Sequence, residues 1–179
     1  QGEVAKKIKK TLVAPVVSYV PEGRINPPEG HMQFSGTISV SEEIFEGILR
    51  DTAHSLKQHG FKTICFLGDS GGNQASQKKV AEELNKEWKN DRVSVLHVSQ
   101  YYENNQQTDW LLNQGYSQEE IGTHAGIRDT SELWYVFEEG VREQEMVNNP
   151  NKAIDRILTG VNGNSTLSSP EKDNFLYLP

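Results

Sequence analysis

The sequence predicts an α/β fold with a mainly parallel central sheet and helices on both faces. Short apolar, β-branched runs such as Thr63–Leu67 and Arg92–Val98 alternate with longer segments whose apolar residues recur at helical spacing. Strands that alternate with helices in this way form parallel sheets through right-handed crossovers. The 179 residues are enough for one such domain with a sizeable core.

Composition excludes several classes of function. The net charge is -7 and no long basic run occurs, so nucleic acid is not an expected partner. The single cysteine, Cys65, rules out a disulfide framework and a cysteine-based zinc site, and we expect it to be a small buried core residue. No apolar run is long enough to span a membrane. We expect a soluble protein, cytoplasmic by default, with an exported form left open because a segment before Gln1 would not be visible.

The chain begins with a helix end and a strand. Val4–Lys10 is basic in its last turn, as the helix dipole prefers. Thr11–Val20 is predicted to be a strand, and Pro15 within it indicates an edge or a bulge. An unpaired edge invites pairing with another segment, so we expect a partner segment or an oligomer contact near Thr11–Tyr19.

A long loop and an amphipathic helix follow. Residues 21–34 form a loop of a length that is usually functional in compact domains, and it contains the candidate binding or loop-positioning residues Glu22 and His31. The next helix is predicted to be capped by Ser41 and to end at Gly60. Its apolar residues are expected on one face: Ile44, Phe45, Ile48, Leu49 and Leu56.

The turn Gly68–Gln74 is the most informative stretch of the sequence. It follows the strand Thr63–Leu67 and precedes a helix, and ligands of open α/β sheets bind at the carboxyl ends of strands. Glycines allow close backbone approach, and a helix N-terminus favours an anion or a metal-bound oxygen. Asp69 and Ser70 are therefore the first candidate site residues. The alternative is a simple connection in which one of them caps the helix.

Further candidates follow the third strand. Tyr101 lies after the strand end and should share a rim with Asp69. Ser117 opens a capping box. His124 lies among small residues, and Asp129 lies in the first turn of a predicted helix, so the pair could bind a metal or act as base and orienter. The alternative is a histidine bonded within its loop and an aspartate that caps a helix.

The Gly68-Asp69-Ser70 turn also suggests a serine nucleophile. It resembles the first block of the SGNH hydrolases, which need a later Asp-x-x-His. Here the only such spacing is Asp51–His54, which lies upstream on an amphipathic helix. A serine hydrolase that uses Ser70 is therefore kept only as a third hypothesis.

Three motifs in register resemble the creatininase (creatinine amidohydrolase) family. Gly30–Ser39 is similar to its H-x-x-F-x-G-T segment, Leu67–Gln74 lies where the family has N-G-H-x-x-N, and His124–Ser131 is similar to H-A-G-x-x-E-T-S. The resemblance implies a three-layer αβα domain, which we assign to residues 1–163, followed by a polar tail at 164–179.

The resemblance also implies an activity. The family cleaves C–N bonds of cyclic or linear amides with divalent zinc or manganese and usually forms oligomers. By this resemblance His124 would be the active-site histidine, Asp129 would replace a glutamate, and Asn73 would fix the turn. Asp69 would be the strong metal ligand left in the turn, while Ser70, His31, Glu22 and Tyr101 would position loops or bind substrate.

The sequence departs from the family at the metal site. The family's N-terminal E-x-H-G-x-H block is not found, so we expect the N-terminal part of its fold to be missing here. A ligand histidine of the family falls on Ser70, and a ligand glutamate found in creatininase itself falls on Gly72. Neither residue can replace these ligands for zinc. Two main hypotheses follow. The first is a metal-dependent, homo-oligomeric amidohydrolase for a small molecule, and the second is an inactive scaffold that binds a small ligand or serves as an oligomer subunit.

Overall fold

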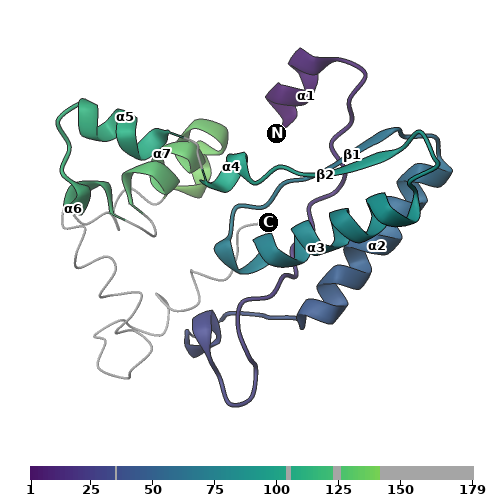
Figure 1. The fold of residues 1–179 in the computed structure, drawn as a ribbon. Helices are drawn as coiled ribbons and strands as arrows, with labels where there is room; N and C mark the ends of the chain where they lie inside the picture. Colours follow the sequence, from purple (N-terminus) through teal and green to yellow (C-terminus); the bar gives the residue numbers. More distant parts are fainter. Residues whose placement is uncertain (35, 104–105, 123–125, 142–179) are drawn as a thin grey trace.

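In the part of the chain that the computed structural model describes, the central element is a two-stranded parallel sheet (Figure 1). Strand β1 (Thr63–Phe66) pairs with β2 (Ser94–His97), and Ile64 lies opposite Val95. Helices α2 (Glu42–Gln58) and α3 (Gly71–Glu87) pack together against the sheet. An α/β fold with a parallel sheet is thus present. The structure describes residues 1–34, 36–103, 106–122 and 126–141.

The remaining elements are short. Helices α5, α6 and α7 lie together beyond the carboxyl ends of the strands (Figure 1). None of the helices in the described ranges is long and apolar enough to cross a lipid bilayer. These elements are α1 (Gly2–Ile8), η1 (Gly30–Gln33), α4 (Gln100–Glu103), α5 (Gln107–Asn113), α6 (Gln118–Ile121), α7 (Ile127–Val136) and η2 (Glu138–Gly140).

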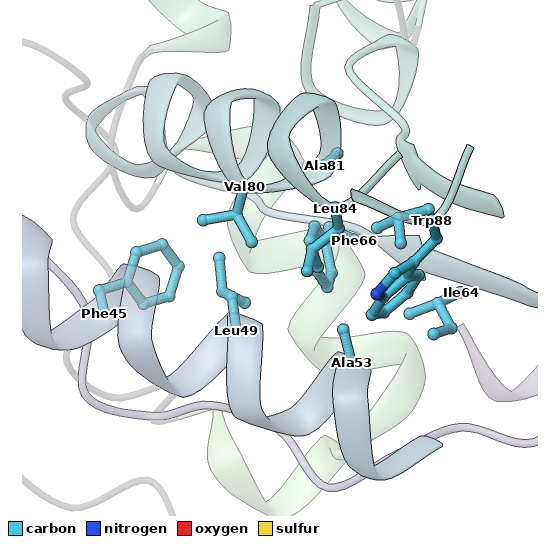
Figure 2. Packing of buried hydrophobic residues seen from close by; sticks show 10 residues of the cluster. Phe45, Leu49, Ala53, Ile64, Phe66, Val80, Ala81, Leu84 and Trp88 are labelled. Carbon is cyan, nitrogen blue, oxygen red and sulfur yellow. The ribbon is translucent and has the colours of Figure 1, made fainter. Parts of the chain in front are cut away.

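The hydrophobic core lies between the two long helices and one face of the sheet (Figure 2). Val80 and Leu84 of α3 are fully buried, and burial of a side chain of this size contributes about 1.5–3 kcal/mol. Around them pack Phe45, Leu49, Ala53, Ile64, Phe66, Ala81, Trp88 and Val95. The core therefore fixes how β1 and α3 meet, and with it the turn between them.

The buried face of α2 includes only part of the apolar face that the sequence predicts. Phe45 and Leu49 face the core, but Ile44 and Ile48, expected on the same face, are 56% and 36% exposed. An α-helix advances about 100° per residue, so neighbours of buried residues point towards its flank. The predicted cap is confirmed, because the Ser41 Oγ accepts a hydrogen bond from the Ile44 amide at 3.3 Å.

The strand predicted for Thr11–Val20 was wrong, because this segment forms no strand in the structure. Pro15 has no amide hydrogen to donate to a ladder. The segment is anchored instead by Val17 and Val20, which pack against the core, and the Val20 carbonyl accepts a bond from the Val40 amide at 3.3 Å.

The prediction that Cys65 is buried was also wrong. Burial alternates along β1, so Ile64 and Phe66 face the helices while Cys65 is exposed on the opposite face. In the described part of the chain, α2 and α3 both cover the same face of the sheet. The three-layer arrangement therefore stays a prediction, and the predicted tail, residues 164–179, lies outside the described residues.

Candidate functional site

The turn between β1 and α3 is held in place by one side chain, that of Gln74. Its Nε2 donates to the carbonyl oxygens of Gly68 at 3.0 Å and Ser70 at 2.9 Å. These two bonds orient the amide, so its Oε1 is the atom that faces Nε2 of His97, 2.8 Å away. An amide oxygen only accepts, so His97 carries a proton on Nε2. His97 is thus a satisfied histidine that supports the turn.

Asn73 lies beneath the same turn and is buried. Its Oδ1 accepts a hydrogen bond from Nε2 of Gln77 at 2.8 Å, and both amides lie next to Gly68. A Cβ atom at Gly68 would overlap the amide of Gln77 and Oδ1 of Asn73. A side chain at position 68 would therefore have to displace this buried pair of amides.

A cavity of about 530 Å³ opens on one side of the turn. Its walls come from the loop after residue 20 and from the starts of two long helices, α2 and α3. We call it the Ser70 pocket and define it by Glu22, Arg24, His31, Ser41, Ser70 and Gly72. It brings together three predicted site residues: Glu22 and His31 from one loop, and Ser70 from a distant part of the sequence.

A pair of side chains forms one wall of the pocket. Nδ1 of His31 lies 2.5 Å from Oε2 of Glu22. The backbone reinforces this pair, because the His31 amide donates to the Glu22 carbonyl and the Glu22 amide donates to the Ser39 hydroxyl, each at 2.9 Å. Arg24 and Glu29 form an ion pair across the same loop. The loop is therefore tied internally and to the segment before α2.

Several ionisable side chains of α4 and α7 lie near Asp69. Burial raises the pKa of Asp69, and the nearby carboxylates of Glu132 and Asp129 raise it further, while Arg128 opposes them. Burial and the charges of Asp69 and Glu132 likewise raise the pKa of Tyr101. We call Asp69, Tyr101, Asp129 and Glu132 the Asp69 cluster. It joins three residues that the sequence analysis singled out.

Sequence reasoning missed Glu132 and Arg128. Glu132 lies three residues after Asp129 on α7, a spacing that places two side chains on one helix face, so the signal was present. His124, predicted as the active-site histidine, lies outside the described residues.

A comparison with known protein families gives a match over nearly the full length of the chain. The sequence model for creatinine amidohydrolase (creatininase) matches residues 1–176. The chain belongs to the creatininase family. Members of this family are metal-dependent amidohydrolases, which supports a hydrolase in general. Among curated proteins, a search found no match to the chain.

The creatininase family implies a divalent metal, which proteins hold with several converging donor side chains. Among the residues that the structure describes, no group of three or more His, Cys, Asp or Glu side chains could hold a metal ion. The three carboxylates of the Asp69 cluster affect one another through their charges, but they do not converge as the three or four ligands of a zinc site do. The described residues of this creatininase-family chain therefore do not fit the metal.

Proposed function

We propose that this creatininase-family chain hydrolyses a C–N bond of a small cyclic or linear amide. The observation that carries the proposal is the Ser70 pocket, which lies at the carboxyl end of β1 beside the turn that resembles the family's ligand-bearing turn. Its volume of about 530 Å³ lies within the usual range for small-molecule sites. The family match over residues 1–176 supplies the reaction class.

Two features of the pocket suit amide hydrolysis. The start of α3 carries partial positive charge, which stabilises the oxyanion that forms when an amide carbonyl is attacked. His31, oriented by Glu22, can move a proton to or from the leaving nitrogen. In the family, a divalent metal would supply an activated water. The described residues do not form the ligand set of such a metal.

The test is a turnover screen with matched histidine variants. Purified protein, either chelated or resupplied with zinc or manganese, is incubated with cyclic and linear amides, and products are detected by mass spectrometry. We expect turnover of at least one amide. His31→Ala should lower kcat/KM at least tenfold, whereas His59→Ala, which removes a histidine at the far end of α2, should leave it unchanged. Absence of turnover in every condition would reject the proposal.

A second candidate is a scaffold that binds a small ligand without chemistry. The observation that favours a scaffold concerns Gly72. A Cβ atom at this position would lie 3.2 Å from the Pro21 carbonyl oxygen. A glutamate at this position, as the resemblance places it in creatininase itself, would press on the loop. The loop therefore packs where that enzyme has a ligand side chain. Calorimetric binding of an amide that survives days of incubation unchanged would favour the scaffold over the hydrolase.

A further inference from the structure

We propose that Glu42 determines the specificity of the Ser70 pocket and selects small amides that carry a positively charged group, such as an ammonium, away from the amide. This inference rests on the proposed function for the reaction and adds the class of substrate. Its basis is an asymmetry between the two helix starts that line the pocket. The start of α2 carries carboxylates, whereas the first turn of α3 has none.

The two long helices begin at the same end of the core. Glu46 of α2 pairs with Lys79 of α3 at 2.6 Å, and one helical turn further along both helices Arg50 pairs with Glu83, also at 2.6 Å. Because the pairs follow in the same order along both helices, α2 and α3 run in the same direction (Figure 1). The Ser70 pocket is therefore lined by two helix starts, which supply Ser41, Glu42, Ser70 and Gly72.

The start of α3 keeps its positive partial charge. The unpaired amides of a helix N-terminus are equivalent to about half a positive charge. The first turn of α3 begins with Gly71 and Gly72 and contains no acidic residue that would neutralise this charge. The oxygen of an amide carbonyl, which is partially negative, is therefore attracted to this side of the pocket.

The start of α2 is negative instead. Glu42 and Glu43 both lie in its first turn, and two formal negative charges exceed the roughly half positive charge of the helix dipole. Both side chains are exposed, but in the described lining of the pocket only Glu42 is present. A positively charged group of a bound molecule is therefore favoured beside Glu42.

Glu42 differs from the other carboxylates around the pocket because no ion pair engages it. Glu22 lies against His31, and Glu29 pairs with Arg24, so both of these acids have a partner within their loop. Among the residues that the structure describes, no lysine, arginine or histidine pairs with Glu42. Even with a protonated histidine, carboxylates outnumber cations here, and walls of one sign concentrate ligands of the opposite sign.

The two helix starts together orient a substrate. Its amide carbonyl faces the start of α3, and its cationic group faces Glu42 at the start of α2. A volume of about 530 Å³ admits a small molecule that carries both groups. Selection of this kind acts on binding and orientation, so it is compatible with any means of activating the attacking water.

The experiment compares three linear amides of similar size that differ in charge. They are δ-aminovaleramide, which carries an ammonium group, the neutral hexanamide and the anionic glutaramate. Calorimetry measures their binding to the full chain, and mass spectrometry detects the carboxylic acids formed from them. We expect the cation to bind at least about fivefold more tightly than the neutral amide, as for one ion pair in bulk water at about 4 Å. This preference should shrink between about 0.01 M and 1 M salt, because exposed charges are screened.

Variants of the first turn of α2 test whether Glu42 is responsible. Glu42→Gln keeps the size of the side chain and should remove the preference for δ-aminovaleramide, and Glu42→Lys should reverse it in favour of glutaramate. Glu43→Gln is the matched control, since it removes the same charge from the same helical turn outside the described lining. It should leave the preference close to that of wild type. Equal effects of the two glutamine variants on this preference would overturn the inference.

The same measurements separate this inference from the proposed function. Turnover that favours the cationic amide, and that Glu42→Gln makes indiscriminate, would support both. Turnover of amides regardless of their charge would overturn the role of Glu42 and leave amide hydrolysis standing. Binding of δ-aminovaleramide that depends on Glu42, without turnover of any amide, would support the charge selection and reject hydrolysis. Neither binding nor turnover would reject both.

Discussion

Nε2 of His97 lies 2.8 Å from Oε1 of Gln74, and this hydrogen bond joins the end of β2 to the turn that follows β1. The other end of the Gln74 amide holds the carbonyls of Gly68 and Ser70. One side chain thus ties together both strand ends and the start of α3. The positions of Asp69 and Ser70 depend on this arrangement, although neither residue contacts His97 in any bond described above.

Gln74→Ala should therefore loosen the turn and lower stability together. It removes the acceptor of the His97 ring and the donor to the carbonyls of Gly68 and Ser70. Loss of such partners costs roughly 1–3 kcal/mol in the free energy of unfolding. Urea unfolding measures the change. The control is Lys78→Ala on the exposed side of α3. Lys78 and Glu82 form a long ion pair, at 4.0 Å, and its loss should change the free energy of unfolding by less than about 0.5 kcal/mol. Equal effects of the two variants would contradict the role of Gln74.

Two glycine substitutions should change stability in opposite directions. Gly68→Ala places a Cβ atom against Gln77 and Asn73 and should lower the free energy of unfolding by about 1–3 kcal/mol. Gly47→Ala, in the interior of α2, meets nothing within 4 Å and should raise it by about 0.5–1 kcal/mol, because alanine favours the helix. Thermal unfolding distinguishes them, and a stabilised Gly68→Ala would show that the turn is open enough for a side chain.

The Asp69 cluster should make stability depend on pH in an unusual direction. The pKa of Asp69 is raised above its ordinary value of 3.8, so the folded state binds more protons between the two values and the free energy of unfolding falls as pH rises through this window. Asp69→Asn cannot ionise. Its stability relative to wild type should therefore increase as pH rises from below 3.8 to above the raised pKa. Urea unfolding across pH 3–8, about the range of carboxylate titration, measures this.

Glu120→Gln provides the control of opposite sign for this measurement. Hydrogen bonds from the Ser117 amide and hydroxyl lower the pKa of Glu120 below its ordinary 4.5. Its charge therefore stabilises the fold above that value, and the benefit is lost as pH falls through the lowered pKa. Glu120→Gln should be less stable than wild type near neutral pH and lose this deficit in acid. The same pH trend for both variants would contradict the environment of Asp69 described above.

We propose that the segment Thr11–Tyr19 mediates self-association with a second copy of the chain. Leu12 and Val16 are 75% and 77% exposed, and the segment forms no strand. Val16→Asp should lower the mass measured by analytical ultracentrifugation. Val136→Asp, which alters a valine on α7 that is 73% exposed, should leave the mass unchanged. A wild-type monomer at every concentration would refute the proposal.

Local sequence signals predicted the elements of the site well. The apolar run before Gly68 predicted β1, and the serines at positions 41 and 117 predicted helix starts that the structure confirms. These features depend on neighbouring residues, since caps and short strands are specified by side chains a few positions away. The family resemblance, which also rested on short motifs, is confirmed by the match over residues 1–176.

The faces of these elements were less predictable. Cys65 was expected in the core because it lies in an apolar strand, yet the placement of both helices on one side leaves it exposed. Thr11–Val20 has strand-forming residues but no ladder, since a strand exists only where a neighbour supplies partners for its backbone groups. Such outcomes depend on distant segments and are not encoded in any short window.

The sequence by itself determined the α/β class, the strand–turn–helix at Gly68–Gln74, the family, and the residue types available for chemistry. Only the tertiary structure decided how those residues are grouped. It placed His31 and Glu22 in one cavity with Ser70, and Asp69 near Asp129 and Glu132. The physical reason is that side chains meet through the packing of α2, α3 and the loop around the turn, and this packing joins residues whose separation in the sequence carries no signal.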